Sequence, residues 1–163
     1  MTGENRVPGI QGSVRAHIAE LEKNLERLKP SLKEIDFWKL RILIHTHDTF
    51  KSQAVQKVPI SHPRSHASLA REFLAEFTND QNLLTIVQYH DEPFALYRQF
   101  ESKGSYNQER MSALLTNVAH WDLFLAFQII DGCTEGKGRE ALFWFFHEIA
   151  GQVESKITKD DIL

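Results

Sequence analysis

Apolar residues recur at steps of three and four along most of the chain, which is the spacing of amphipathic helices. The first run starts at Ser13, whose hydroxyl is suited to cap a helix N-terminus, and Pro30 interrupts it. A second helix is expected from Ser31 to about Asp48. It begins amphipathic and becomes almost wholly apolar at residues 40–44, which predicts that its C-terminal end is buried.

The later segments follow the same pattern. Two prolines and the lack of a sustained period predict a surface loop at residues 51–65. Further helices are expected at residues 66–77, with Ser65 as a candidate N-cap, and at residues 83–91, 93–100, 109–131 and 139–157. The sequence shows no strand alternation, hairpin turn signal or repeat. It therefore predicts an all-α helical bundle of five to seven helices in one domain (residues 13–163), after a flexible lead-in (residues 1–12).

Composition narrows the class of protein. The chain has 163 residues, of which 42% are apolar and 25% charged, as in ordinary globular domains. The net charge of −3 provides no general field for nucleic acid or an anionic membrane. Cys133 is the only cysteine, which excludes a disulfide framework and a cysteine-based zinc site. No apolar run reaches the roughly 18 residues of a membrane span, and the N-terminus lacks a signal-peptide core. We expect a cytoplasmic protein.

Several histidines and aspartates lie within or beside apolar helical sequence, where an unpartnered polar group is costly. The six such residues are His17, His47, Asp48, His66, His90 and Asp131. They would satisfy one another if they converged on a cation. Imidazole together with carboxylate suits Fe, Mn, Zn, Co or Ni better than Ca.

Each of these residues also has an ordinary interpretation. His17 fits a surface position on its helix, and His66 fits the first turn of the helix that follows Ser65. His90 fits a helix C-terminus, where the dipole favours an imidazolium, and Asp131 fits a solvated helix end. The doublet formed by residues 47 and 48 is harder to explain in this way, because it directly follows an apolar run. His45 should not share a site with the doublet, because it lies about 200° round the helix from residue 47.

Three segments resemble the HD-domain superfamily of metal-dependent phosphohydrolases. "VRAHIAELE" is similar to the opening helix of the family, "LRILIHTHDTFK" to its His-Asp doublet segment, and "LAFQIIDGCTEGKG" to its closing segment. The resemblance spans roughly residues 13–150. It implies metal ligands at His17, His47, Asp48 and Asp131, and a catalytic lysine at Lys51.

A subgroup of this superfamily binds two metals and has two further histidines, which "SHASLAREFL" and "VQYHDEP" would supply as His66 and His90. The resemblance then implies a dinuclear centre of Fe or Mn, with Ni, Co, Zn or Mg as alternatives, and with Asp48 bridging the ions. Two departures stand out. The doublet is followed by Thr-Phe-Lys where the family has glycine before the lysine. The Gly-Tyr-Pro signature of the cyclic-dinucleotide enzymes is absent after "HDEP", which argues against that substrate.

The last aspartate requires a choice between Asp122 and Asp131. The two are nine residues apart, about 900° along a continuous helix, so only one can point at the site. Asp131 is preferred because it ends an apolar run before a glycine. His120 lies near the same face, and we expect it to be an ordinary helix residue rather than a partner of the ligands.

Positive charge near the centre would contact the phosphate of a substrate. Lys51, one helical turn beyond His47, is the best candidate. Three weaker candidates, which are more often ordinary surface cations, are Arg71, Arg98 and Lys137. Asp91 and Glu92 would move protons or orient a water, or would simply be solvated.

The predicted function is hydrolysis of a phosphomonoester or phosphodiester of a nucleotide or related small molecule, in which Asp48 and Lys51 serve catalysis. Two alternatives remain open: a di-iron oxygenase of the same fold, and a non-catalytic sensor or RNA-associated module. The expected partner is a small-molecule phosphoester, and no membrane association is expected. Nucleic acid is not indicated by the charge, and the sequence leaves a homo-oligomer open.

Overall fold

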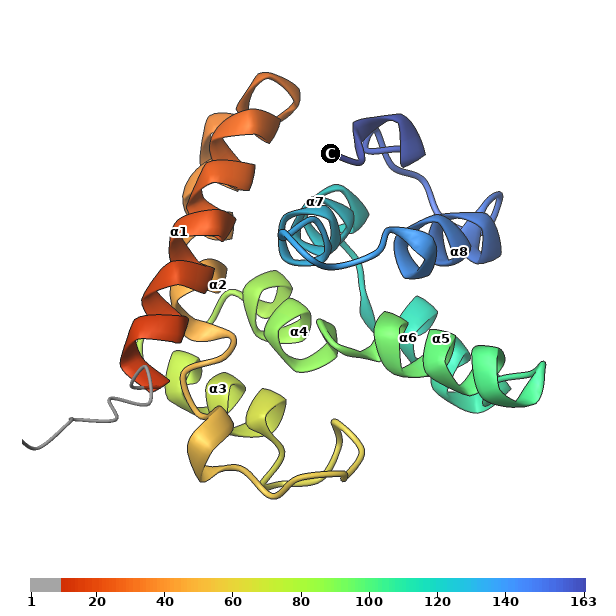
Figure 1. Ribbon diagram of the computed structural model, residues 1–163, viewed down its shortest axis with the longest axis horizontal. Coiled ribbons are helices and arrows are strands. Elements are labelled where there is room, and N and C mark those ends of the chain that lie inside the picture. The colour runs from red at the N-terminus through yellow and green to blue at the C-terminus, as the bar shows by residue number, and fades with distance from the viewer. Residues whose placement is uncertain (1–9) are drawn as a thin grey trace, which may run out of the picture.

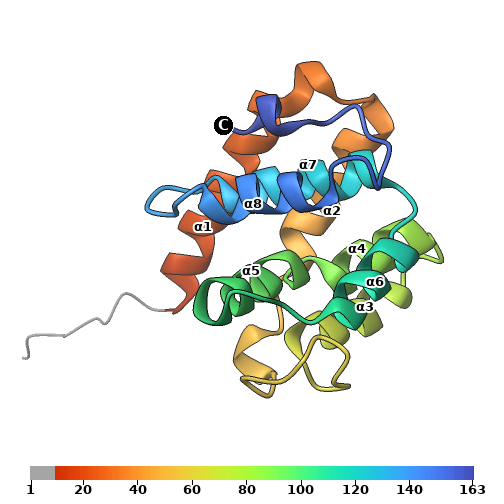
Figure 2. The ribbon, with the colours of Figure 1, turned by 90° about the vertical axis from the view of Figure 1, so that its right-hand side faces the viewer.

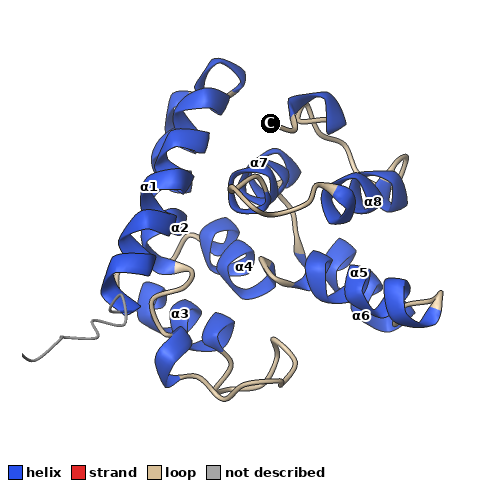
Figure 3. Ribbon diagram, viewed as in Figure 1, coloured by secondary structure: helices blue, strands red, loops and turns tan. Residues whose placement is uncertain are grey.

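The computed structural model describes residues 10–163, and every regular element in this range is helical (Figure 3). Its eight α-helices are α1 (Ile10–Leu28), α2 (Glu34–Thr46), α3 (His66–Ala75), α4 (Gln81–Tyr89), α5 (Glu92–Lys103), α6 (Gln108–Asn117), α7 (Trp121–Gly132) and α8 (Glu140–Ile149). Short 3₁₀ turns lie at Lys29–Ser31, Lys51–Gln53 and Lys159–Asp161. The expected all-α class is confirmed.

Helix α7 forms the centre of the fold. Its residues from Leu123 to Ile130 are all buried, as expected for a helix that is apolar on every side. Helices α1 and α2 pack against each other and against α7, while α8 contacts α7 from another side and also packs on α5 (Figure 1). The view in Figure 2 shows α7 and α8 side by side, with α5 beneath them. The C-terminal end of α7 is therefore surrounded by helices from both halves of the chain.

Local polar side chains set several helix boundaries. Ser65 caps α3 as predicted, since its hydroxyl accepts a hydrogen bond from the backbone N–H of Ser68. The segment expected as one helix at residues 109–131 divides, because His120 accepts a hydrogen bond from Leu123 N–H and starts α7 there. The resulting bend between α6 and α7 is 120° and accounts for the eighth helix.

The first and last helices differ from their predicted bounds. Helix α1 begins at Ile10, so Ser13 lies inside the helix rather than at its N-cap. Residues 1–9 of the expected lead-in lie outside the described residues. Helix α8 ends at Ile149 instead of residue 157, because Gly151 takes the left-handed backbone conformation (φ 78°) that terminates helices. In the described part of the chain, no single helix has the length and hydropathy needed to cross a membrane.

Candidate metal centre

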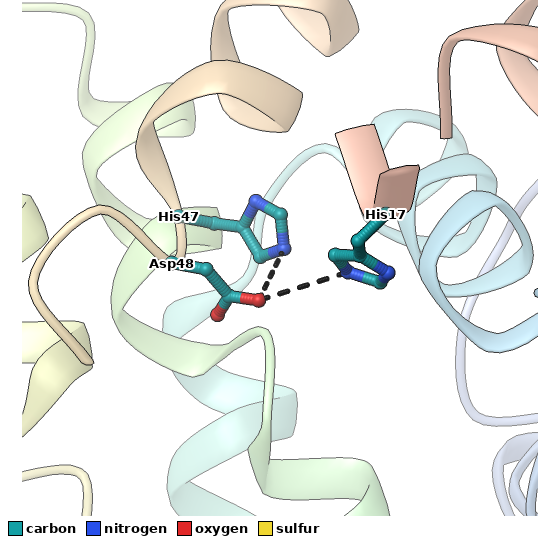
Figure 4. Close-up of side chains that lie close together, drawn as sticks. All are labelled: His17, His47 and Asp48. Atoms are coloured by element: carbon teal, nitrogen blue, oxygen red, sulfur yellow. Dashed lines mark ion pairs between the residues drawn. The ribbon is translucent and has the colours of Figure 1, made fainter. Parts of the chain in front are cut away.

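Three helices bring one histidine and the doublet together with Asp131. His17 lies on α1, His47 is the C-cap of α2 with Asp48 directly after it, and Asp131 lies in the last turn of α7. His47 Nε2 lies 3.2 Å from Asp48 Oδ2 and 3.5 Å from Asp131 Oδ1. His17 Nε2 lies 3.8 Å from Asp48 Oδ2 and 3.7 Å from Asp131 Oδ1. Figure 4 shows His17 and His47 converging on the same carboxylate oxygen of Asp48. The structure therefore brings together the four residues that the resemblance implied as metal ligands: His17, His47, Asp48 and Asp131.

A second group forms on the other side of the same aspartate. His66 begins α3 and His90 is the C-cap of α4. One ligand atom each from Asp48, His66 and His90 lies within 4.8 Å of the others, and the same is true of His17, His47 and Asp48. Asp48 turns its Oδ1 atom toward His90, whose Nε2 is 3.8 Å away. The two groups therefore share Asp48, and all six predicted ligand residues lie in one cluster.

Hydrogen bonds to the backbone fix the ring orientation of the two deepest histidines. The Nδ1 atom of His47 lies 2.9 Å from the carbonyl oxygen of Leu43, and Nδ1 of His90 lies 2.7 Å from that of Val87. A carbonyl oxygen only accepts, so each ring carries its proton on Nδ1 when neutral and leaves a lone pair on Nε2. This orientation, with a backbone carbonyl holding the other nitrogen, is common among metal-binding histidines.

The cluster contains buried polar atoms without hydrogen-bond partners. The Nε2 atoms of His47, His66 and His90 and the Oδ1 atom of Asp48 are all of this kind. Leaving such a group unsatisfied typically costs about 1–3 kcal/mol. Metal binding in the two groups would satisfy all four atoms, so the buried histidine and aspartate groups fit a metal ion.

Asp91, for which the sequence suggested proton transfer, orientation of a water or a solvated position but not metal binding, lies beside both histidines of the second group. Its Oδ2 lies 2.5 Å from His66 Nε2 and its Oδ1 lies 3.5 Å from His90 Nε2. The contact with His66 lacks hydrogen-bond geometry, since that Nε2 has no hydrogen-bond partner. A signal was present in the sequence: His90-Asp91 is a second His-Asp doublet, and like the first it follows directly on the end of an apolar helix.

Charge coupling in the cluster shifts the pKa values of its members. Burial lowers the pKa of His47, but Asp131 and Asp48 outweigh it and raise the pKa to about 10. Burial opposes ionisation of Asp48 and Asp131 too, yet the neighbouring histidines hold both pKa values well below their usual range. Without a metal, a proton on His47 therefore balances the carboxylates. A metal that binds Nε2 must displace this proton.

Two lysines lie beside the cluster. Lys51, in the 3₁₀ turn after the doublet, has its Nζ 3.2 Å from Asp48 Oδ2. Burial lowers the pKa of Lys51, but the charge of Asp48 raises it above its usual value, so the side chain stays cationic. Lys137 donates a hydrogen bond from Nζ to the backbone carbonyl of Asp131 (3.1 Å). Both positions agree with the sequence prediction of cations near the centre.

The other two predicted phosphate contacts are less direct. Arg98, on α5, lies over the ring of Phe94, with its Cζ 5.9 Å from the ring centroid. Arg71 lies on α3, the helix that carries His66, but in the described residues it makes no ion pair or hydrogen bond with the cluster. The structure therefore places Lys51 and Lys137 at the centre and leaves the two arginines outside it.

The geometry favours Asp131 over Asp122 as the aspartate that α7 contributes to the cluster. Asp122 accepts hydrogen bonds from Ser155 Oγ (2.6 Å) and the Lys156 N–H (2.7 Å), and so ties the C-terminal segment to the start of α7. His120 caps α7, and its Nε2 lies 3.3 Å from Asp36, away from the cluster. Its expected role as an ordinary helix residue fits this position.

Two further polar groups are engaged elsewhere. Glu92, considered for proton transfer, is buried and forms a bidentate ion pair with Arg110, so its carboxylate holds α5 to α6. His45 pairs with Glu22 on the outer face of α1 and α2 (2.7 Å), in agreement with its exclusion from the site.

Asn24 supports the end of α7, although the sequence reasoning did not select it. This buried residue donates from its side-chain amide to the carbonyl oxygens of Ile130 (2.9 Å) and Cys133 (3.0 Å). These are free carbonyls at a helix C-terminus, which need a partner. The sequence carries a signal of this burial, because Asn24 lies on the same helix face as the apolar Leu21 and Leu28.

A cavity of about 360 Å³ adjoins the cluster. His90, Asp91 and Asp131 contribute to its wall, and the remaining wall comes from Gln128 and Gly132 of α7, from α5, from α8 and from the loop before α8. A small molecule in this cavity would therefore contact the candidate metal ligands directly.

Comparisons of the chain with known protein families, curated proteins and solved structures find no match. The assignment of the cluster therefore depends on its own geometry and chemistry.

Proposed function

We propose that the protein is a metal-dependent phosphohydrolase that cleaves a phosphomonoester or phosphodiester of a nucleotide or related small molecule. The observation that carries the proposal is the pair of ligand groups that share Asp48. A carboxylate between two metal ions is the arrangement expected of dinuclear hydrolytic centres. The resemblance of the sequence to HD-domain phosphohydrolases points the same way.

The two ions would be held by different sets of residues. His17, His47, Asp48 and Asp131 would bind the first ion, and Asp48, His66, His90 and Asp91 would bind the second. This mixture of imidazole and carboxylate favours Fe or Mn, with Co, Ni or Zn as substitutes, over Mg, which prefers oxygen ligands.

Metal ions in such a centre lower the pKa of a bound water toward 7 and polarise phosphoryl oxygens. The chain supplies the remaining charge stabilisation. Lys51 would hold its ammonium against the phosphoryl oxygens, because it already lies 3.2 Å from the shared aspartate. Lys137 would add a second positive charge from the wall of the cavity, beside Asp131.

The first experiment is metal analysis of protein purified without chelator, followed by hydrolysis assays with Mn, Fe, Co and Ni. Because two ligand groups are present, we expect about two equivalents of metal and release of phosphate from small phosphoesters. Asp48→Asn should lose both properties. Asp122→Asn is the matched control, because it changes an aspartate of α7 that lies outside the cluster.

Protein that binds no metal and releases no phosphate would refute the proposal and favour a non-catalytic module. Uptake of O₂ on addition of substrate, with an absorption band from an oxidised di-iron centre, would instead identify an oxygenase.

A further inference from the structure

We propose that the cavity beside the metal centre receives an uncharged aromatic group of the substrate, so that the enzyme prefers phosphomonoesters that carry an aromatic ring to phosphorylated sugars that lack one. This inference rests on the proposed phosphohydrolase function. It adds the class of organic group that the substrate carries and the residues that select it.

The cavity is continuous with the centre. His90, Asp91 and Asp131 line one end, and Lys137 stands beside Asp131 at the same end. A phosphate bound at the centre would therefore direct its ester group along the cavity, between α5 and α8.

The walls beyond this end are mostly apolar. They are formed by Pro93, Phe94 and Tyr97 of α5 and by Ala141, Leu142 and Phe145 of α8. Phe94 is 53% exposed, so its ring is accessible at the edge of the cavity. Arg98 lies over this ring, with its Cζ 5.9 Å from the centroid, yet more than half of Phe94 remains accessible, and a ligand that covers it would remove apolar surface from water.

The arrangement of large and small side chains favours a flat group. Phe94 and Tyr97 lie one helical turn apart on α5, and the ring of Tyr97 is supported by Trp144 at 5.7 Å. Gly138 and Ala141 contribute little or no side chain to the wall from α8 and its preceding loop. The two rings of α5, together with an α8 side that combines these small residues with the apolar Leu142 and Phe145, suit a planar ring that stacks in an offset or edge-to-face manner.

The size and charge of the cavity disfavour polymers, polyphosphates and free sugars as occupants. About 360 Å³ lies near the lower end of small-molecule sites and suits one ring-bearing group rather than a polymer. Beyond the candidate ligands, the charged residues of the lining are Lys137 and Glu140, which carry opposite charges. They would not neutralise a polyphosphate tail, and the apolar walls would leave most hydroxyls of a sugar without partners.

The test compares three primary-alkyl monophosphates on manganese-loaded protein: ethyl phosphate, ribose 5-phosphate and 2-phenylethyl phosphate. All three release a primary alkoxide, so their intrinsic reactivities are similar and the group that enters the cavity is the main difference. We expect kcat/KM for 2-phenylethyl phosphate to exceed the other two at least tenfold, about what burial of one phenyl ring provides. Equal values, or a preference for ribose 5-phosphate, would overturn the inference.

Phe94→Leu tests the aromatic contact while keeping an apolar side chain. It should reduce the advantage of the phenyl compound by roughly threefold to tenfold. Phe143→Leu is the matched control, because Phe143 lies on α8 with a similar exposure of 49% but is not part of the cavity wall. An equal effect of both variants would show that Phe94 has no specific role in selection.

A binding measurement separates this inference from the proposed function. Calorimetry of 2-phenylethylphosphonate and ethylphosphonate requires no hydrolysis of a phosphoester. Tighter binding of the phenyl compound, weakened by Phe94→Leu, would support the aromatic site even if no phosphoester were hydrolysed. Equal binding of both phosphonates, together with hydrolysis of all three esters at similar rates, would refute the site and leave the function standing.

Discussion

The imidazole of His17 and the carboxylate of Asp131 lie close together, with Nε2 and Oδ1 3.7 Å apart, although they belong to the first and seventh α-helices. This contact closes the metal centre, because it joins the N-terminal helix to the apolar central helix. It depends on how α1 packs against the C-terminal end of α7. The same two helices are linked by a second interaction, the amide of Asn24.

We predict that Asn24→Ala destabilises the fold and loosens the centre. The substitution leaves the carbonyls of Ile130 and Cys133 without their buried donor, which costs about 1–3 kcal/mol. Urea denaturation should show this loss in the free energy of unfolding. Asn117→Ala is the control, because that amide makes an exposed bond within its own helix and should change stability by less than about 0.5 kcal/mol.

The position of Asp91 predicts a selective loss of one metal ion. Asp91→Asn removes a carboxylate oxygen that lies 2.5 Å from His66 Nε2, whereas the group around His17 stays complete. After dialysis, metal analysis should find close to one equivalent instead of two, or affinity for the second ion lowered at least tenfold. Asp160→Asn, at an exposed position, should retain both ions. Full occupancy in the Asp91 variant would show that this aspartate is not a ligand.

The sequence was informative about the centre because its members are polar residues placed against an apolar pattern. The doublet follows the buried end of α2 and Asp131 ends the long apolar run of α7, so these polar groups stand where burial is costly. The all-α class followed from the same periodicity. Asp91 was missed because it precedes Glu92 and Pro93, a polar turn in which a solvated carboxylate is ordinary.

Other features required the tertiary structure. Hydropathy predicts that a helix is buried but does not specify which helices meet. The pairing of Glu92 with Arg110 and the cavity between α5 and α8 were therefore not predictable from the pattern. The break between α6 and α7 was missed because a local cap by His120 prevailed over an apolar run that continues past it.

The raised pKa of His47 predicts opposite pH dependences with and without metal. In the metal-free protein the charged imidazole stabilises the fold fully below about pH 6.5, the ordinary histidine pKa, and this contribution is lost as the pH rises through about 10. Chelator-treated protein should therefore melt at lower temperature as the pH increases across this window.

Metal affinity should rise over the same pH range, since fewer protons compete for Nε2 of His47. Calorimetry in two buffers of different ionisation enthalpy should detect at least one proton released on metal binding at neutral pH. An affinity that is independent of pH from 6.5 to 9 would contradict the assignment of His47 as a ligand.

Lys51→Met should impair catalysis far more than stability or metal binding. The side chain of Lys51 is more than half exposed, so its ion pair with Asp48 contributes little to folding. A cation positioned at the phosphoryl oxygens is commonly worth about 10²–10³ in kcat, and Lys51→Arg should recover part of this loss because it restores the charge. Lys23→Met, which removes an exposed lysine of α1, is the control and should leave kcat unchanged.

If Lys51→Met kept the kcat of the unmodified protein, the phosphate would have to be stabilised by another cation. Lys137, which lines the cavity and donates a hydrogen bond to the backbone carbonyl of Asp131, would then be the next residue to replace.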